Sequence, residues 1–110
     1  MATAQKVLGQ NAPAATTPVN LYTVPALKYA VVSTIVVCNR GGTATTFRLS
    51  VAVAGAGADV KQHLYYDVSI SANDTFAATI GITLATTDVV VIYAGNTNLS
   101  FNLFGTEGDV

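Results

Sequence analysis

The sequence predicts an all-β protein, either an antiparallel β-sandwich or a jelly-roll-like barrel of about seven or eight strands. Three observations lead to this prediction. Apolar residues recur with a period of two and not with the helical period of 3.6. Turn-forming residues separate the apolar stretches at intervals of roughly 8–12 residues. No stretch of ordinary helix length has a convincing helical pattern.

Alternation is clearest in residues 47–53 and 99–103, where apolar and polar side chains take turns. The side chains predicted to face a common core are Phe47, Leu49, Val51, Phe101 and Leu103. Two stretches, 29–39 and 88–94, are so dense in β-branched residues that we expect strands covered on both faces. The remaining expected strands are 63–70, 74–84 and, more weakly marked, 19–24 and 6–10. Gly, Asn and Asp clusters at 40–42, 55–59, 71–74 and 95–98 predict the turns.

A length of 110 residues and a mass of 11.3 kDa fit a single domain. Residues 19–110 are predicted to form it, and residues 1–18 to form an extended arm or edge segment ahead of it. Pro13 and Pro18 interrupt any regular ladder in this segment. Composition predicts that the segment is dispensable for folding and needed for attachment to a neighbour. A floppy terminus and a first strand of the domain's own sheet remain alternatives.

Charged residues make up only 10% of the chain, against about 25% in typical soluble domains, while hydrophobic residues make up 51%. Such a surface favours contact with other protein, and we expect a homo-oligomer, most simply a trimer. The five basic residues are scattered, which argues against nucleic-acid binding. No apolar stretch approaches the roughly 18 residues of a membrane span. Cys38 is the only cysteine, so no intrachain disulfide is expected, in agreement with folding in a reducing cytoplasm.

The single histidine, His63, is predicted to share one strand face with Tyr65 and Asp67. A catalytic triad is not indicated because no Gly-x-Ser-x-Gly motif is present, so we interpret His63 as an interface residue and expect no enzyme. One His and one Cys are too few for a zinc site, and no cofactor is expected. The aspartates near strand ends are interpreted as turn-stabilising, and Gly55-Ala56-Gly57 as a flexible hairpin. The candidate interface residues are Lys6, Val7, Leu8, His63 and Tyr65.

Several blocks of the sequence are similar to a group of small proteins encoded by tailed bacteriophages and prophages. The most specific are Tyr22-Thr23-Val24-Pro25-Ala26, which follows Leu21, and Asn73-Asp74-Thr75-Phe76. Further blocks are Lys6–Gln10, Val31–Arg40, Ala44–Arg48, Leu64–Asp67, Ile80–Leu84 and Leu99–Gly105, so the resemblance covers nearly the whole chain. It implies a virion-associated structural protein, made in the bacterial cytoplasm of the host, and it carries no catalytic residues to transfer.

Within that class, the leading hypothesis is a capsid decoration, or cement, protein that binds major capsid subunits and stabilises the head. The alternative is a tail, baseplate or fibre-associated protein that contacts glycan on the host surface. A wall-degrading enzyme is disfavoured, because most of the six acidic residues lie at expected turns and the chain has little mass with which to form a cleft between two carboxylates.

Overall fold

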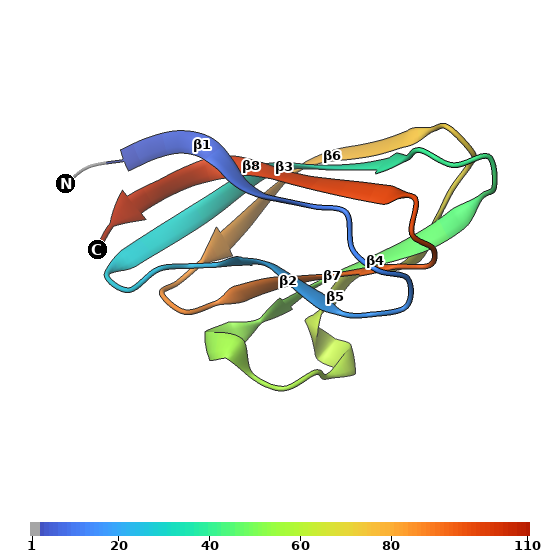
Figure 1. Cartoon of the computed structure of the whole chain (residues 1–110). Helices are drawn as coiled ribbons and strands as arrows, with labels where there is room; N and C mark the ends of the chain where they lie inside the picture. The colour runs from blue at the N-terminus through green and yellow to red at the C-terminus, as the bar shows by residue number, and fades with distance from the viewer. Residues whose placement is uncertain (1–2) are drawn as a thin grey trace.

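The computed structural model describes residues 3–110, and these form two four-stranded sheets packed face to face (Figure 1). The predicted all-β sandwich is therefore confirmed, with eight strands in the described residues. The elements are β1 (Thr3–Asn11), β2 (Val19–Thr23), β3 (Lys28–Asn39), β4 (Thr45–Ala52), η1 (Val53–Gly55), η2 (Val60–Gln62), β5 (His63–Ile70), β6 (Thr75–Leu84), β7 (Val89–Ala94) and β8 (Leu99–Asp109).

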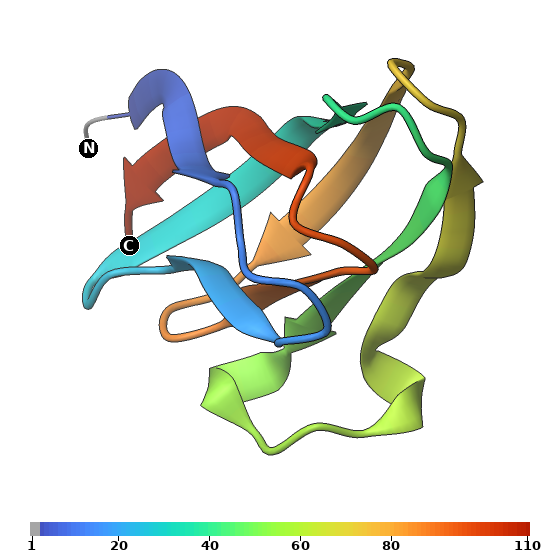
Figure 2. The ribbon, with the colours of Figure 1, turned by 45° about the vertical axis from the view of Figure 1, so that its right-hand side comes forward.

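One sheet has the strand order β1-β8-β3-β6, and we call it the terminal sheet because it joins the first and last strands. The other has the order β2-β7-β4-β5, and we call it the loop sheet because the long β4–β5 connection projects from it (Figure 2). Every neighbouring pair of these strands is antiparallel. No helix in the described residues is long and apolar enough to cross a membrane.

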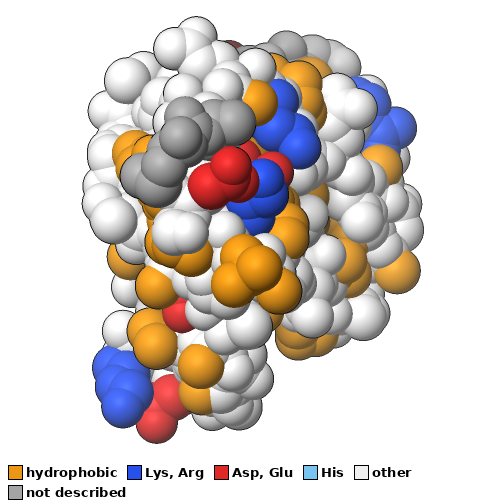
Figure 3. All heavy atoms as spheres, turned by 90° about the vertical axis from the view of Figure 1, so that its left-hand side faces the viewer, with side chains coloured by type: hydrophobic (Ala, Val, Ile, Leu, Met, Phe, Trp, Pro, Cys, Tyr) orange, Lys and Arg blue, Asp and Glu red, His pale blue; other side chains and the backbone are white. Residues whose placement is uncertain are grey.

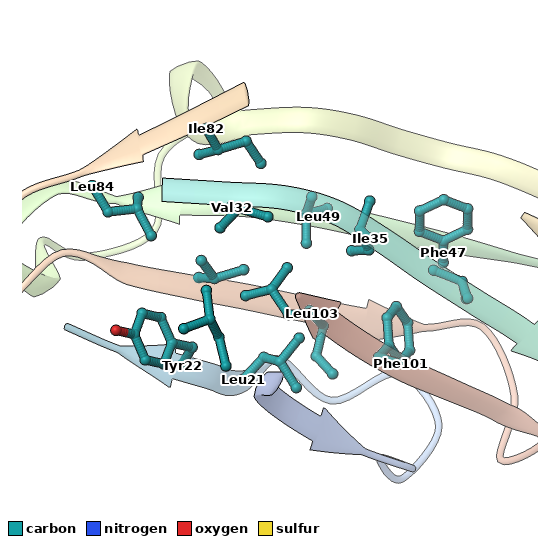
Figure 4. Packing of buried hydrophobic residues seen from close by; sticks show 14 of the residues in the cluster. Leu21, Tyr22, Val32, Ile35, Phe47, Leu49, Ile82, Leu84, Phe101 and Leu103 are labelled. Atoms are coloured by element: carbon teal, nitrogen blue, oxygen red, sulfur yellow. The ribbon is translucent and has the colours of Figure 1, made fainter. Parts of the chain in front are cut away.

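The core lies between the two sheets, and the predicted core residues meet there (Figure 4). Phe47, Leu49, Phe101 and Leu103 are completely buried, and Val51 is half-buried against them. Phe47 lies at the centre of an aromatic group, with its ring centroid 6.1 Å from that of Phe101. Period-two alternation places these side chains on the inner faces, so the prediction of a common core is confirmed.

The strands match the predicted stretches, with two differences. β8 continues to Asp109, well past the predicted end at Leu103. The prediction that β3 is covered on both faces is wrong, because Val31 is 37% exposed and Ser33 is exposed on the outer face of the terminal sheet. Cys38 shares this outer face and is half-buried. A β-branched stretch predicts a strand well, but it does not reveal whether a second layer covers it.

The outer face of the terminal sheet carries no charged side chain on β3, β6 or β8 within the described residues. Strand register and alternating burial identify the outward residues. They include Val31, Val36 and Cys38 from β3, Ser100, Asn102, Phe104 and Thr106 from β8, and Thr75, Ala77, Thr79 and Thr83 from β6. The low proportion of charged residues in the sequence therefore leaves one broad face of the protein without charged side chains on these three strands.

The structure places the N-terminal segment along the body. Residues 3–11 form the edge strand β1, which pairs with β8 from Thr3–Gly108 to Asn11–Phe101. The following residues cross to the loop sheet, where the Thr16 amide donates a hydrogen bond of 2.8 Å to the Ala94 carbonyl. The described part of the segment thus lies as an edge strand of this chain's own sheet, and its use in attachment to a neighbour stays a prediction.

A small group of charged and polar side chains closes the end of the sandwich where the two termini lie (Figure 3). The Tyr22 hydroxyl donates a hydrogen bond of 2.5 Å to Glu107 Oε2, and Lys6 lies 3.4 Å from Glu107 Oε1. Lys28 pairs with Asp109 beside them. The hydrogen bond from Tyr22, with the nearby lysine charges, lowers the pKa of Glu107, although burial opposes this shift. Burial and the Glu107 contact together raise the pKa of Tyr22.

The contacts of Glu107 predict how the stability of the protein changes at acidic pH. Because the folded pKa of Glu107 lies below its unfolded value of about 4.3, its contribution to stability is complete above that pH. The contribution is lost as the pH falls through the folded pKa. We expect Glu107→Gln to make the denaturant midpoint fall less steeply between about pH 5 and pH 3. Tyr22→Phe removes the hydroxyl that donates to Glu107, and it should flatten the dependence of the denaturant midpoint on pH in the same way. If this dependence is the same for the parent and Glu107→Gln, Glu107 is not responsible for it.

Candidate functional site: a cavity beneath the β4–β5 loop

The β4–β5 connection, residues 53–62, projects from the loop sheet away from the core (Figures 1 and 2). The Asp88 carboxylate anchors its start, accepting hydrogen bonds from the amides of Ala54 at 2.8 Å and Ala85 at 2.9 Å. Asp59 and Gln62 form a reciprocal capping box at its end, with each side chain accepting a hydrogen bond from the backbone of η2 or its N-cap. The predicted flexible hairpin is therefore a hairpin connection with a defined conformation.

A cavity of about 360 Å³ lies between this loop and the outer face of the loop sheet. Its floor is a row of directly paired residues that crosses all four strands: Asn20 of β2, Val91 of β7, Ser50 of β4 and His63 of β5. Directly paired residues on neighbouring strands point to the same face, so these side chains lie together beneath the loop. The loop and the sheet thus build a concave site with a mixed polar and apolar floor.

Arg48 and Tyr93, which are paired across β4 and β7, form the next row of the floor. The Arg48 guanidinium lies 4.3 Å from the ring centroid of Tyr66 and 4.4 Å from that of Tyr93. Its Nε and Nη2 donate hydrogen bonds of 2.7 and 3.3 Å to Asp67. These bonds raise the pKa of Arg48 and lower the pKa of Asp67. The contacts fix the guanidinium on both faces and on one edge.

The prediction that His63, Tyr65 and Asp67 share one face is wrong for Tyr65, while His63 and Asp67 both lie on the outer face of the loop sheet. The register of β5 against β4 shifts twice, between the pairs Phe47–Val68 and Leu49–Tyr65 and again before Ser50–His63. Asp67 has a positive φ of 51° at the first irregularity. Each bulge inserts a residue and reverses the alternation. As a result, His63 lines the cavity while Tyr65 points into the core, where its ring lies 5.2 Å from that of Phe76.

Tyr66, which follows Tyr65 in the sequence, is 57% exposed, and its ring meets that of His63 edge to face with the two centroids 4.9 Å apart. The sequence predicts that one of Tyr65 and Tyr66 faces out but not which one, and it did not single out Arg48 or Tyr93. A signal was present for Arg48, because it alternates outward between Phe47 and Leu49. Nothing in the sequence indicated that Tyr93 and Tyr66 would flank it, since this requires the strand order β7-β4-β5.

The five candidate interface residues do not form one surface. Lys6, Val7 and Leu8 belong to β1 at the edge of the terminal sheet, whereas His63 and Tyr65 belong to β5 at the edge of the loop sheet. Leu8 is buried in the core at the β1 bulge, and Val7 is 44% exposed beside it. Within the described residues, the exposed candidates are Lys6 and Val7, with His63 half-buried.

The described residues that line the cavity do not form a Ser-His-Asp triad. His63 Nδ1 is buried and has no hydrogen-bond partner among the described residues, so no carboxylate orients this imidazole as a triad requires. Residues 3–110 contain no group of three or more His, Cys, Asp or Glu side chains that could hold a metal ion. The arrangement is suited to binding, with fixed polar and aromatic groups around an open volume.

No protein-family model matches the sequence, and no curated protein does. Among solved structures, the chain is similar to one in the structure of infectious bursal disease virus, Gx strain. The TM-score is 0.56 at 10% identity, over 96% of this chain and 32% of the other. A pentameric capsid protein isolated from metagenomic phage sequences aligns more loosely, with a TM-score of 0.42 at 14% identity, over 98% of this chain and 60% of that one. The first likeness shows a shared fold, and this chain spans about a third of its viral counterpart.

Proposed function

We propose that this chain is a structural protein of a bacteriophage particle, and more specifically a decoration protein that binds the major capsid subunits of the head. The observation that carries the proposal is the outer face of the terminal sheet. It is broad, it presents Val, Ala, Phe, Thr and Ser side chains, and it carries no charge on β3, β6 or β8. Depletion of charge is the compositional mark of the central part of protein–protein interfaces.

Two further observations support the proposal. The sandwich fold is shared with a chain of a virus structure, although a fold by itself does not determine function. The sequence blocks around Tyr22 and Asn73 resemble small phage proteins. We also propose that the chain self-associates, most simply as a trimer, because identical chains with adherent surfaces usually form closed rings.

Copy number on the particle tests where the protein is located. A decoration protein should be present at roughly hundreds of copies, since it follows the repeated capsid lattice. Quantitative mass spectrometry of purified particles, referenced to the major capsid protein, measures this directly. A handful to dozens of copies would contradict the head assignment and favour the tail, baseplate or a fibre.

A pair of matched variants tests the proposed surface. Thr79→Lys places a charge at an exposed position on the outer face of the terminal sheet, whereas Thr97→Lys places one in the exposed β7–β8 turn. We expect both variants to fold, and only Thr79→Lys to lose attachment to particles that lack the protein. Attachment of Thr79→Lys at the parent level would show that another surface makes the contact.

A further inference from the structure

We propose that the cavity beneath the β4–β5 loop is a binding site for a neutral saccharide. This inference goes beyond the proposed function and does not depend on it, because the cavity lies on the loop sheet and the proposed capsid-binding face lies on the terminal sheet. The volume of about 360 Å³ is at the lower end of the range for small-molecule sites, which suits a ligand of one or two sugar rings.

The polar groups of the floor are available to a ligand. Asn20 and Ser50 line the cavity and make no side-chain hydrogen bond to another described residue. These two groups come from β2 and β4, and they lie in one cross-strand row with Val91 of β7 between them. An amide and a hydroxyl together offer both donors and acceptors. Sugar hydroxyls, each a donor and an acceptor, match such a set.

The charged groups around the cavity are already engaged. Arg48 is held by Asp67 and lies between two tyrosine rings. The Asp59 carboxylate accepts the Lys61 amide within the loop. The Arg48–Asp67 pair has no net charge with which to attract a carboxylate or phosphate, and a neutral ligand leaves this pair intact. The charge distribution therefore favours a neutral ligand over an anion.

The apolar part of the cavity floor can contact the face of a sugar ring that presents C–H groups. Val91 and Tyr93 of β7 and Ala52 of β4 line the same cavity. The electron-rich face of an aromatic ring attracts weakly positive C–H groups, and the ring of a saccharide presents such groups on one face. The loop anchors at Asp88 and Asp59 hold the facing wall in place, so little ordering is required on binding.

The test uses the purified full chain, ¹⁵N-labelled, titrated with glucose, galactose, mannose, N-acetylglucosamine and their disaccharides. We expect at least one of these sugars to shift the amide signals of residues 20, 50, 62–63 and 91–93 in a saturable manner. Asn20→Ala should weaken binding by roughly fivefold, as for the loss of one hydrogen bond. The double variant Asn20→Ala with Ser50→Ala should abolish the shifts at concentrations that saturate the parent.

Asn102→Ala is the matched control, because Asn102 lies on the outer face of the other sheet. It should bind the sugar as the parent does. Acetate and a neutral dipeptide complete the panel as ligands of other chemistry. The proposal is overturned if no sugar shifts the cavity amides, if the shifts map elsewhere, or if only acetate or the dipeptide binds. Because no particle is involved, a negative result here leaves the proposed capsid role untouched.

Discussion

Replacing Phe101 by Ala is expected to lower the free energy of unfolding by about 3–5 kcal/mol. Phe101 is completely buried, and its ring meets that of Phe47 edge to face at the centre of the sandwich. Removing it takes away the transfer free energy of the ring and leaves a cavity that two hydrogen-bonded sheets cannot close. Urea denaturation, followed by circular dichroism, measures the change.

Phe104→Ala is the control, because Phe104 is on the same strand and points to the outer face, where it is half-buried. This variant should lose far less stability than Phe101→Ala. Equal losses for the two variants would mean that the inner and outer faces of β8 have been assigned incorrectly.

Deleting residues 1–11 is expected to lower the free energy of unfolding by about several kcal/mol, because it removes the β1–β8 backbone hydrogen bonds and one buried leucine. Composition predicts that this segment is dispensable for folding, but the pairing of β1 with β8 predicts the reverse. The deletion removes β1, takes Leu8 out of the core and leaves β8 as an unprotected edge. Denaturation midpoints, together with sedimentation to detect aggregation, measure the outcome.

Two point variants separate the contribution of the core from that of the backbone ladder. Leu8→Ala should lower the free energy of unfolding by about 2–3 kcal/mol, whereas Val7→Ala at the exposed neighbouring position should cost under about 1 kcal/mol. A truncated chain that melts at the parent's midpoint would show that β1 does not contribute to the fold's stability, and would favour its role in attachment.

The sequence predicted the strands and the core because both depend on local alternation. Phe47, Leu49, Phe101 and Leu103 show a period of two, and they are all in the core. The same reasoning failed in β5, because a bulge between His63 and Tyr65 reverses the alternation and places these two side chains on opposite faces. A bulge depends on the pairing with the neighbouring strand, and a period read along one strand cannot show it.

The cavity could not be predicted from the sequence for a related reason. Its floor joins Asn20, Ser50 and His63, which are far apart in sequence and meet only through the strand order β2-β7-β4-β5. Its wall depends on the Asp88 carboxylate, which reaches the amide of Ala54 from another turn. The sequence did indicate that aspartates near strand ends stabilise turns, and Asp59, Asp74 and Asp88 all accept backbone hydrogen bonds there.

The adjacency of β1 and β8 also bears on when the protein can fold during its synthesis. β8 lies between β1 and β3, so the terminal sheet has no continuous centre until Leu99–Asp109 has left the ribosome. Until then β1 has no partner strand, and the inner face of β3 lacks one neighbour. Topologies dominated by such distant pairings fold slowly, on a scale of roughly milliseconds to seconds. The pairing of β1 with β8 can therefore form only after the whole segment between them has been synthesised.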